Sequence, residues 1–192
     1  MHNNSFHPKV YSILLNWNSY KLTDQAIKSI MAQTFPTKIV VVDNGSTDGS
    51  QKYIKTNFPK IKLIENGKNL GYSRGFNEGI NYAINKKADF IFIMNNDAVI
   101  SRNSIKSLVN ILEKDESIGF ASGKVYSDLS TRKLETVGKK SHKYSIVGNH
   151  IGQEEIDNGQ YNEITERDYV DDIFMLVRRE VIEKVGSYNK DF

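Results

Sequence analysis

Residues 38–50 read KIVVVDNGSTDGS, an apolar run of β-branched residues that ends in Asp43 and passes directly into a tight polar turn. An apolar run without polar alternation is typical of a strand that is covered on both faces, as in parallel sheets. The runs VYSILL at 10–15 and DFIFIM at 89–94 have the same character. Together the three runs predict the centre of an open parallel sheet.

Apolar residues at helical spacing follow these strands. They predict helices at 22–33, at 76–85, at 101–114 and through the turn after Asp43 to Asn57, with a short strand at 62–65. Thr23 or Asp24 is expected to cap the first helix. Because strand and helix alternate with short connections, right-handed crossovers and a doubly wound sheet follow. The predicted fold is α/β, with a Rossmann-like, mostly parallel sheet that is flanked by helices.

Past residue 127 the alternation weakens into polar, hairpin-like pieces. Strands are expected at 118–126, 146–151 and 172–177, and a helix is expected to begin near Arg178. No Pro-rich linker, charge block or internal repeat marks a boundary. We therefore expect one domain over residues 1–192, with a mixed segment after the parallel half.

Composition narrows the class of protein. The formal net charge is +3, and the basic residues are scattered, which argues against nucleic acid as a partner. That charge suits an enzyme that handles phosphate esters or works beside anionic lipid, and it is equally an ordinary solubility feature. Zero cysteines leave oxygen and imidazole as metal ligands, so any metal should be hard, such as Mg or Mn. No bilayer span or secretory signal is evident, which predicts a cytoplasmic protein.

Ligands of open α/β sheets bind at the carboxyl ends of the strands, and polar residues follow three of the expected strands there. After the second strand, Asp43 offers a rigid acceptor for the ring N–H of a uracil or thymine base. The equally strong alternative is that Asp43, Asn44 and Gly45 form an Asx-type turn.

The segment NLGYSRGFNEG at 69–79 places its glycines four residues apart, which is not the G-x-G-x-x-G spacing of a dinucleotide fingerprint. Glycines with this spacing lie on one helix face and permit a close approach to a sheet. Gly71 and Arg74, at the helix start, are candidates for contact with phosphate. Gly75 and Gly79 have close packing as an equally weighted role.

The run FIFIMNNDAVI at 90–100 ends in Asn95, Asn96 and Asp97. Three polar side chains at the mouth of a buried strand are costly unless they have partners. A divalent cation that bridges a diphosphate is such a partner, with Asp97 as its ligand. A simple turn from strand to helix is the less favoured alternative.

The ordered set SILLNWNS, AQTFP, VVVDNGSTDGS, NLGYSRGFNEGI and FIFIMNNDAVI resembles the family 2 glycosyltransferases, especially their rhamnosyltransferase-like branch. The resemblance covers about the first two thirds of the chain, and DIFMLVRREVIEKVGSYNKDF resembles the start of the family's acceptor-side segment. It implies a GT-A fold and inverting transfer from a UDP- or dTDP-sugar to a glycan or lipid-linked acceptor, with Mg or Mn. It also implies a role in cell-surface polysaccharide biosynthesis and peripheral association with the inner face of the membrane.

The resemblance also assigns residues. It places Asn16 and Trp17 in the nucleoside pocket and makes Asp43 the base-binding aspartate. It puts Asn69, Gly71 and Arg74 beside the ribose and diphosphate, counts Asn96 among the donor-binding groups, and makes Asp97 the metal-binding last position of a D-x-D motif. Asn95 replaces the first aspartate of that motif, so metal binding without nucleotide should be weak.

The chain stops at GSYNKDF, where the family continues to a Glu-Asp pair that supplies the catalytic base. The expected organisation is a nucleotide-sugar-binding half at 1–100 and an incomplete acceptor half at 101–192. Among the remaining acceptor-side carboxylates, Asp172 is the candidate base, beside Asp171, although solvated loop positions are the favoured interpretation for both. His142 and His150 lack metal-ligand spacing and are expected to have surface or structural roles.

Two other functions stay open. The chain could bind a nucleotide sugar without transferring it, or it could be a metal-dependent nucleotidyltransferase. A nucleotidyltransferase should carry a Gly-rich, basic loop after the first strand, and NWNSYKL is not one. The leading hypothesis places Asp43 and Asp97 on neighbouring parallel strands, at opposite ends of one nucleoside diphosphate.

Overall fold

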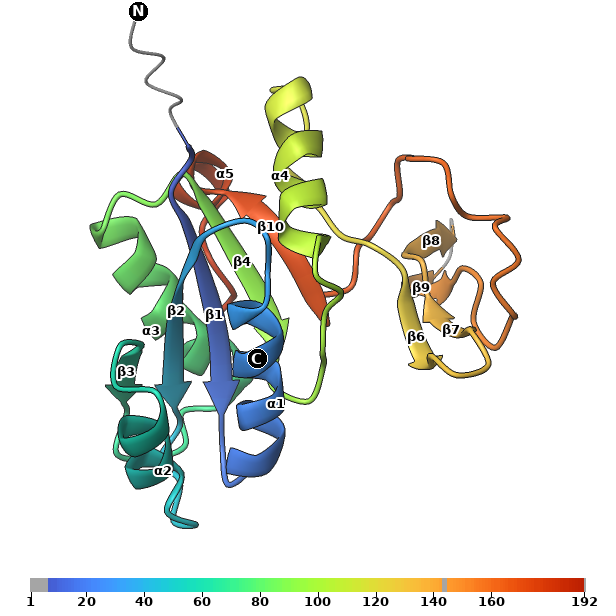
Figure 1. The fold of residues 1–192 in the computed structure, drawn as a ribbon. Helices are drawn as coiled ribbons and strands as arrows, with labels where there is room; N and C mark the ends of the chain where they lie inside the picture. Colours follow the sequence, from blue (N-terminus) through green and yellow to red (C-terminus); the bar gives the residue numbers. More distant parts are fainter. Residues whose placement is uncertain (1–6, 143–144, 192) are drawn as a thin grey trace, which may run out of the picture.

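The computed structural model describes residues 7–142 and 145–191, and for 142–148 no side chain is described. Its body is a six-stranded sheet in the order β3-β2-β1-β4-β10-β5 (Figure 1). The strands are β1 (Val10–Asn16), β2 (Thr37–Asp43), β3 (Lys62–Glu65), β4 (Phe90–Asn95), β5 (Phe120–Ala121) and β10 (Phe174–Arg178). The first four are parallel, and β10 runs antiparallel to both β4 and β5. The predicted α/β fold with a mostly parallel sheet is confirmed.

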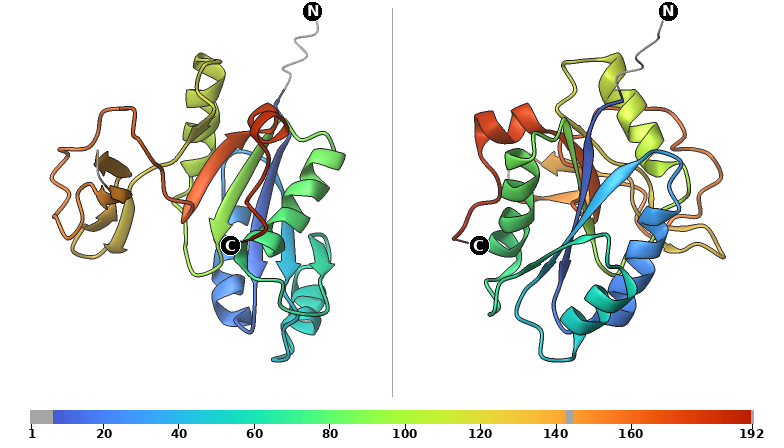
Figure 2. Two further views of the ribbon diagram at one scale, coloured as in Figure 1. Left: turned by 180° about the vertical axis from the view of Figure 1, so that it is seen from behind. Right: turned by 60° about the vertical axis from the view of Figure 1, so that its left-hand side comes forward.

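Helices cover both faces of this sheet (Figure 2). One apolar layer joins the sheet to α1 (Tyr20–Met31), α2 (Ser50–Asn57) and α4 (Ser104–Lys114), and the other joins it to α3 (Tyr72–Asn85) and α5 (Arg179–Val185). Side chains of β1 alternate between the two layers: Leu14 faces the first and Ile13 the second. Burial on both faces explains why the strand sequences lack polar alternation.

Three helix starts differ from the sequence prediction. The helix α4 begins at Ser104, three residues after the expected start at 101. The starts of α1 and α3 differ for a shared reason. The helix α1 begins at Tyr20, so Thr23 lies inside its first turn, fully buried, and does not cap it. The helix α3 begins at Tyr72, four residues before the expected start at 76. The first turns of α1 and α3 contain polar residues that form hydrogen bonds at the carboxyl ends of the strands. Because these positions are polar, the apolar spacing that indicates a helix begins later in the sequence.

The close approach of α3 to the sheet depends on two of its glycines. A Cβ atom on Gly79 would lie 2.4 Å from Cγ2 of Ile13, and one on Gly75 would lie 2.6 Å from Cδ1 of Leu15. Such distances leave no room for a side chain. The packing role that was one of two possibilities for these glycines is therefore present.

Strand register brings the candidate residues to one edge. Asn16 of β1 pairs with Asp43 of β2, and Leu15 of β1 pairs with Asn95 of β4. The strand β1 lies between β2 and β4, so the prediction that Asp43 and Asp97 follow neighbouring strands is wrong. Two strand spacings separate these ends, or about 10 Å.

The remaining strands form an arm beside the body (Figure 1). The arm contains β6 (Val125–Asp128), β7 (Lys133–Thr136), β8 (Lys139–His142) and β9 (Ser145–His150), as two separate two-stranded sheets. The single strand predicted at 118–126 is wrong, because it divides into β5 of the body and β6 of the arm. Gly123 lies at the division, where glycine weakens strand continuity.

Candidate functional site

The Asp43 carboxylate is the centre of the β1 and β2 ends, and it is fully buried. Its Oδ2 accepts hydrogen bonds from Asn16 Nδ2 at 2.7 Å and Ser46 Oγ at 2.7 Å. Its Oδ1 accepts them from the Ser46 backbone N–H at 2.9 Å and Gln51 Nε2 at 2.6 Å. The Asp43 side chain thus bonds to the backbone of its own turn, three residues on and not two as in an Asx-turn. Because both oxygens already have protein donors, direct contact with a nucleotide base would require rearrangement.

Asn16 extends this network through the interior to the end of β4. Thr23 of α1 donates its hydroxyl proton to Asn16 Oδ1 at 2.7 Å, and Asn96 Nδ2 donates to Thr23 Oγ1 at 2.9 Å. Asn16 and Thr23 are fully buried, as Asp43 is. The sequence predictions for Asn16, Asp43 and Asn96 therefore fall on one connected group.

Trp17 lies on the β1–α1 turn, at the edge of this network. The side chain is 55% exposed. The turn is fastened to the turn after β2, because the Asn18 N–H donates to Ser46 Oγ at 2.9 Å and the Thr47 N–H donates to Asn18 Oδ1 at 2.7 Å. An exposed indole on a fixed turn is available to stack on a base.

Asn44 joins the end of β2 to the loop before α3 through side-chain hydrogen bonds. Its Nδ2 donates to Asn69 Oδ1 at 2.8 Å and to the Gly71 carbonyl at 3.1 Å. Asn69 Oδ1 also accepts the Gly71 N–H at 2.8 Å. Gly71 has a φ of +82°, a backbone conformation that favours glycine. Asn69 and Gly71 thus lie at the expected edge, held by protein contacts, and the role of Asn44 was missed in the sequence.

Arg74 reaches toward the C-terminal segment. Its Nε donates to the Lys190 carbonyl at 2.9 Å. One turn later, Asn77 is almost fully buried and exchanges two hydrogen bonds with the Tyr188 backbone, at 2.8 and 3.1 Å. Arg74 and Asn77 therefore fix residues 188–190 on α3, and contact between Arg74 and phosphate remains a prediction.

The three residues after β4 differ in their contacts. Asn95 Oδ1 accepts a hydrogen bond from the Tyr72 hydroxyl at 3.1 Å, and Asn96 is tied to Thr23. Asp97 is exposed, and no described residue forms a hydrogen bond or ion pair with its carboxylate. It is thus the available anionic group at this edge.

A cation would fit Asp97 only with ligands from a bound molecule. Within the described residues, no group of three or more His, Asp or Glu side chains is arranged to hold a metal ion. Mg and Mn take about six ligands in near-octahedral geometry and often use phosphate oxygens and water beside one or two carboxylates. The donor set therefore fits the expected dependence of the metal on nucleotide.

Asp172 lies beside this edge, where the Tyr72 hydroxyl contacts both Asn95 and Asp172. It is half-buried, and its Oδ2 accepts hydrogen bonds from the hydroxyls of Tyr72 at 2.9 Å and Tyr188 at 3.1 Å. Burial, together with the Asp172 carboxylate, raises the pKa of both tyrosines far above their usual range, so both remain proton donors. Asp172 is therefore a hydrogen-bonded, part-exposed residue of the turn before β10, and its role as a base remains a prediction.

Asp171 faces the arm instead. It accepts a hydrogen bond from Thr136 at 3.0 Å and forms an ion pair with Lys139 at 2.7 Å, and Nδ1 of His150 lies 3.6 Å from it. The surface or structural role of His150 stays a prediction, and the side chain of His142 is outside the described part. Asp171 also lines a cavity of about 900 Å³ between the body and the arm, with Phe120 and Tyr161 among its walls.

Contacts between residues far apart in sequence explain what the sequence analysis missed. Tyr72 and Asp172 are separated by 100 positions, and Asn77 and Tyr188 by 111. The roles of Thr23, Ser46 and Gln51 also became visible only in the fold. One signal was available: a polar residue at a core-facing position of an amphipathic helix, as Thr23 is, indicates a buried hydrogen bond.

The open, mostly parallel α/β sheet, with polar loops at the carboxyl ends of β1, β2 and β4, is a GT-A fold. Residues 13–186 match the model of the glycosyl transferase family 2, and the chain belongs to that family. No helix of the described residues is long and apolar enough for a membrane span.

Relatives and solved structures agree with this assignment. A low-salt glycan biosynthesis hexosyltransferase of Haloferax volcanii is 24% identical over 94% of this chain and 56% of its own length. A Pyrobaculum calidifontis mannosyltransferase in complex with GDP-Man and Mn²⁺ superposes with a TM-score of 0.66 at 20% identity, over 97% of this chain and 49% of that one. Staphylococcus aureus TarS 1–349 with UDP-GlcNAc gives a TM-score of 0.62 at 16% identity, over 94% and 48%. The chain thus spans about half the length of these proteins.

Proposed function

We propose that the protein transfers a sugar from a nucleoside diphosphate donor to a glycan or lipid-linked acceptor, with inversion and with the help of a divalent cation. One observation carries the proposal: three strand ends bring a hydrogen-bonded polar network, the exposed Trp17 and the unpaired carboxylate Asp97 to one edge. About 10 Å between the ends of β2 and β4 suits an extended nucleoside diphosphate. Family membership favours sugar transfer over nucleotidyl transfer.

In this proposal the donor lies along the edge, with its base beside Trp17 and its diphosphate beside Asp97. When bound, Mg²⁺ or Mn²⁺ would neutralise charge that develops on the departing diphosphate. Asp97 would hold the cation, and Asn69, Gly71 and Arg74 would line the diphosphate side. UDP and dTDP are the expected nucleotides, and GDP must be tested beside them, because the Pyrobaculum protein was solved with GDP-Man.

Asp172 is the proposed carboxylate for the acceptor. Inverting transfer requires a group that takes the proton of the attacking hydroxyl. Tyr72 and Tyr188 hold one carboxylate oxygen of Asp172, and no described residue donates a hydrogen bond to the other, Oδ1. The acceptor would approach from the side of the arm, where the cavity borders Asp171. A lipid-linked acceptor would place the protein at the inner face of the membrane.

The proposal is tested with a panel of UDP-, dTDP- and GDP-sugars, including a dTDP-rhamnose donor for the rhamnosyltransferase-like branch. Trp17 is the single tryptophan of the chain, so its fluorescence reports nucleotide binding at this edge directly. We expect a saturable change with at least one nucleotide in the presence of Mn²⁺, and donor hydrolysis or transfer in the same mixture.

Two variants test whether nucleotide binding in Mn²⁺ depends on Asp97. Asp97→Asn should lose nucleotide-dependent fluorescence changes in Mn²⁺, whereas Asp128→Asn, an exposed carboxylate of the arm, should not. If no nucleotide binds to the folded protein, the proposed function is wrong. If nucleotide binds but neither hydrolysis nor transfer follows, the protein is a nucleotide-sugar-binding module and the transfer step of the proposal is wrong.

A further inference from the structure

Three linked hydrogen bonds, each donated in the direction of Asp43, cross the interior between the two ends of the proposed donor site. Asn96 Nδ2 donates to Thr23 Oγ1 at 2.9 Å, Thr23 donates to Asn16 Oδ1 at 2.7 Å, and Asn16 Nδ2 donates to Asp43 Oδ2 at 2.7 Å. Asn96 follows β4, and Thr23, Asn16 and Asp43 belong to α1, β1 and β2. Thr23 stands in the middle, fully buried, with no role in the function proposed above.

The direction of these hydrogen bonds follows from Asp43. Both oxygens of Asp43 accept hydrogen bonds from protein donors, so the Asn16 amide turns its NH₂ toward Asp43 and its oxygen toward Thr23. The Thr23 hydroxyl then has to donate to that oxygen, which leaves its lone pairs for an incoming donor. Asn96 supplies that donor, and its own amide oxygen therefore faces away from Thr23.

We propose that Thr23 is a positioning residue for the cation end of the site. This proposal rests on the proposed function. Thr23 fixes the rotamer of Asn96, and the backbone that joins Asn96 to Asp97 then sets the direction of the Asp97 carboxylate toward the cation. Asp97 has no hydrogen bond of its own among the described residues, so the turn is held by its neighbours, Asn95 through Tyr72 and the adjacent Asn96 through Thr23. Groups that orient metal ligands in this way influence metal affinity strongly.

The test is the ratio of nucleotide affinities at saturating Mn²⁺ and in EDTA, measured with the nucleotide that the wild-type protein binds best. Thr23→Val keeps the shape of the side chain and removes both hydrogen bonds. We expect the Mn²⁺-dependent gain in affinity to fall about 10- to 100-fold, with little change in EDTA. Thr23→Ser retains the hydroxyl and should restore most of the gain.

Ile27→Val is the matched control, because Ile27 is fully buried one turn further along α1 and makes only apolar contacts. It should reduce the melting temperature and leave the Mn²⁺-dependent gain intact. If Thr23→Val fails to fold, Asn96→Ala at the half-buried end of the three linked hydrogen bonds must show the same selective loss. A folded Thr23→Val, or Asn96→Ala, with the wild-type gain overturns the inference.

The two proposals fail in different ways. Absence of nucleotide binding in the wild-type protein contradicts the proposed function. Normal Mn²⁺-dependent binding in the wild-type protein, together with an unchanged ratio in Thr23→Val, contradicts the role of Thr23 alone. An equal loss in Mn²⁺ and in EDTA would also overturn the inference, because it indicates general damage to the fold.

Discussion

The body and the arm of this protein are held together by different forces. The body buries two layers of aliphatic and aromatic side chains against its sheet. In the arm, among the described residues between 122 and 170, Leu134 is the only large apolar side chain that is fully buried. A region with so little apolar burial gains little from the hydrophobic effect and must depend on specific polar contacts.

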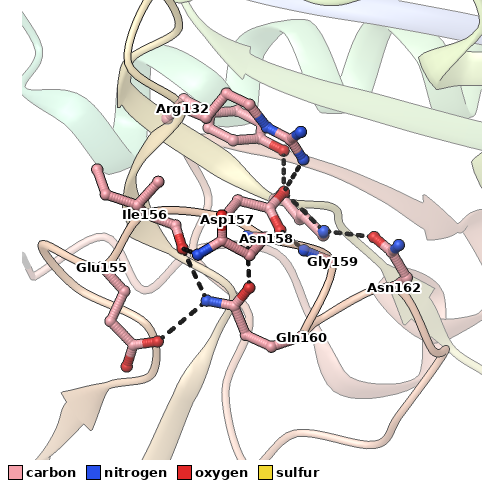
Figure 3. A network of polar contacts seen from close by, with 10 residues as sticks. Arg132, Glu155, Ile156, Asp157, Asn158, Gly159, Gln160 and Asn162 are labelled. Atoms are coloured by element: carbon pink, nitrogen blue, oxygen red, sulfur yellow. Dashed lines mark hydrogen bonds and ion pairs between the residues drawn. The ribbon is translucent and has the colours of Figure 1, made fainter.

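Asp157 is the centre of those contacts (Figure 3). It is almost fully buried and pairs with Lys124 at 2.8 Å and Arg132 at 3.4 Å. It also accepts hydrogen bonds from the Tyr126 hydroxyl at 2.5 Å and the Gly159 N–H at 2.9 Å. Hydrogen bonds from Lys124 and Tyr126 hold the pKa of Asp157 far below its usual value. One carboxylate thus joins β6, the β6–β7 turn and the loop after β9.

The comparison extends to the edge of the sheet where β1, β2 and β4 end. Asp43 is buried there, as Asp157 is in the arm, whereas Asp97 is exposed. Buried carboxylates with several donors serve the fold, whereas an exposed carboxylate without partners is free to meet a ligand. This difference separates positions where mutation should affect stability from positions where it should affect binding.

The largest effect on stability is expected for Asp43→Ala. Four donors around Asp43 would lose their acceptor in the interior, and we expect a loss of about 3–5 kcal/mol in the free energy of unfolding. Asp97→Ala is the matched control and should change stability by less than about 0.5 kcal/mol. Urea unfolding measures both, and equal losses would contradict the division between the two aspartates.

A smaller effect, of unusual sign, is expected for Gly79→Ala in the body. Alanine normally stabilises a helix relative to glycine by about 1 kcal/mol. Here the added Cβ would lie 2.4 Å from Ile13 Cγ2, so we expect destabilisation of about 1–3 kcal/mol instead. Asn81→Ala on the exposed face of the same helix is the control. Stabilisation by Gly79→Ala in urea unfolding would show that α3 packs less closely than described.

The smallest global effect is expected for Asp157→Asn, because its consequences should be confined to the arm. Amide hydrogen exchange should become faster in 124–160 and stay unchanged in β1, β2 and β4. Glu163→Gln, an exposed neighbour, should leave the exchange of both regions unchanged. Faster exchange throughout the body would contradict the independence of the two regions.

The same variant has a predicted pH dependence. A carboxyl group with a lowered pKa in the folded state contributes stability above its unfolded pKa of about 3.9, and this stability is lost as the pH falls toward the folded value. Protection of the arm in the wild-type protein should therefore decline below about pH 4. The difference between wild type and Asp157→Asn should shrink over the same range. A constant difference down to low pH would show that the charge of Asp157 is not what holds the arm.

The sequence predicted the body far better than the arm, for a physical reason. Continuous apolar runs such as 38–43 and 89–94 identify buried strands locally, and their order fixes where the polar ends meet. The arm has few apolar residues, so the contacts of Asp157 with Lys124 and Arg132 carry no local pattern. The prediction of one strand at 118–126 is wrong because this segment crosses the boundary between the body and the arm.

The site was predicted in part for a related reason. Residues at strand ends, including Asn16, Asp43 and Asp97, could be located because the sheet determines their position. The hydrogen-bond partners of Asn16 and Asp43 could not, since Thr23 and Gln51 reach them only through the folded chain. The sequence therefore predicted the edge at which Asp43 lies, but not that protein groups already donate hydrogen bonds to both of its carboxylate oxygens.

The central claim is that Asp97 holds a cation only together with a nucleoside diphosphate. Its most direct test is Mn²⁺ binding to the protein, followed by water proton relaxation, with and without the best-binding nucleotide. We predict weak binding of Mn²⁺ alone, a strong ternary signal with nucleotide, and loss of that signal in Asp97→Asn. Tight binding of Mn²⁺ without nucleotide, or an unchanged ternary signal in Asp97→Asn, would contradict the account.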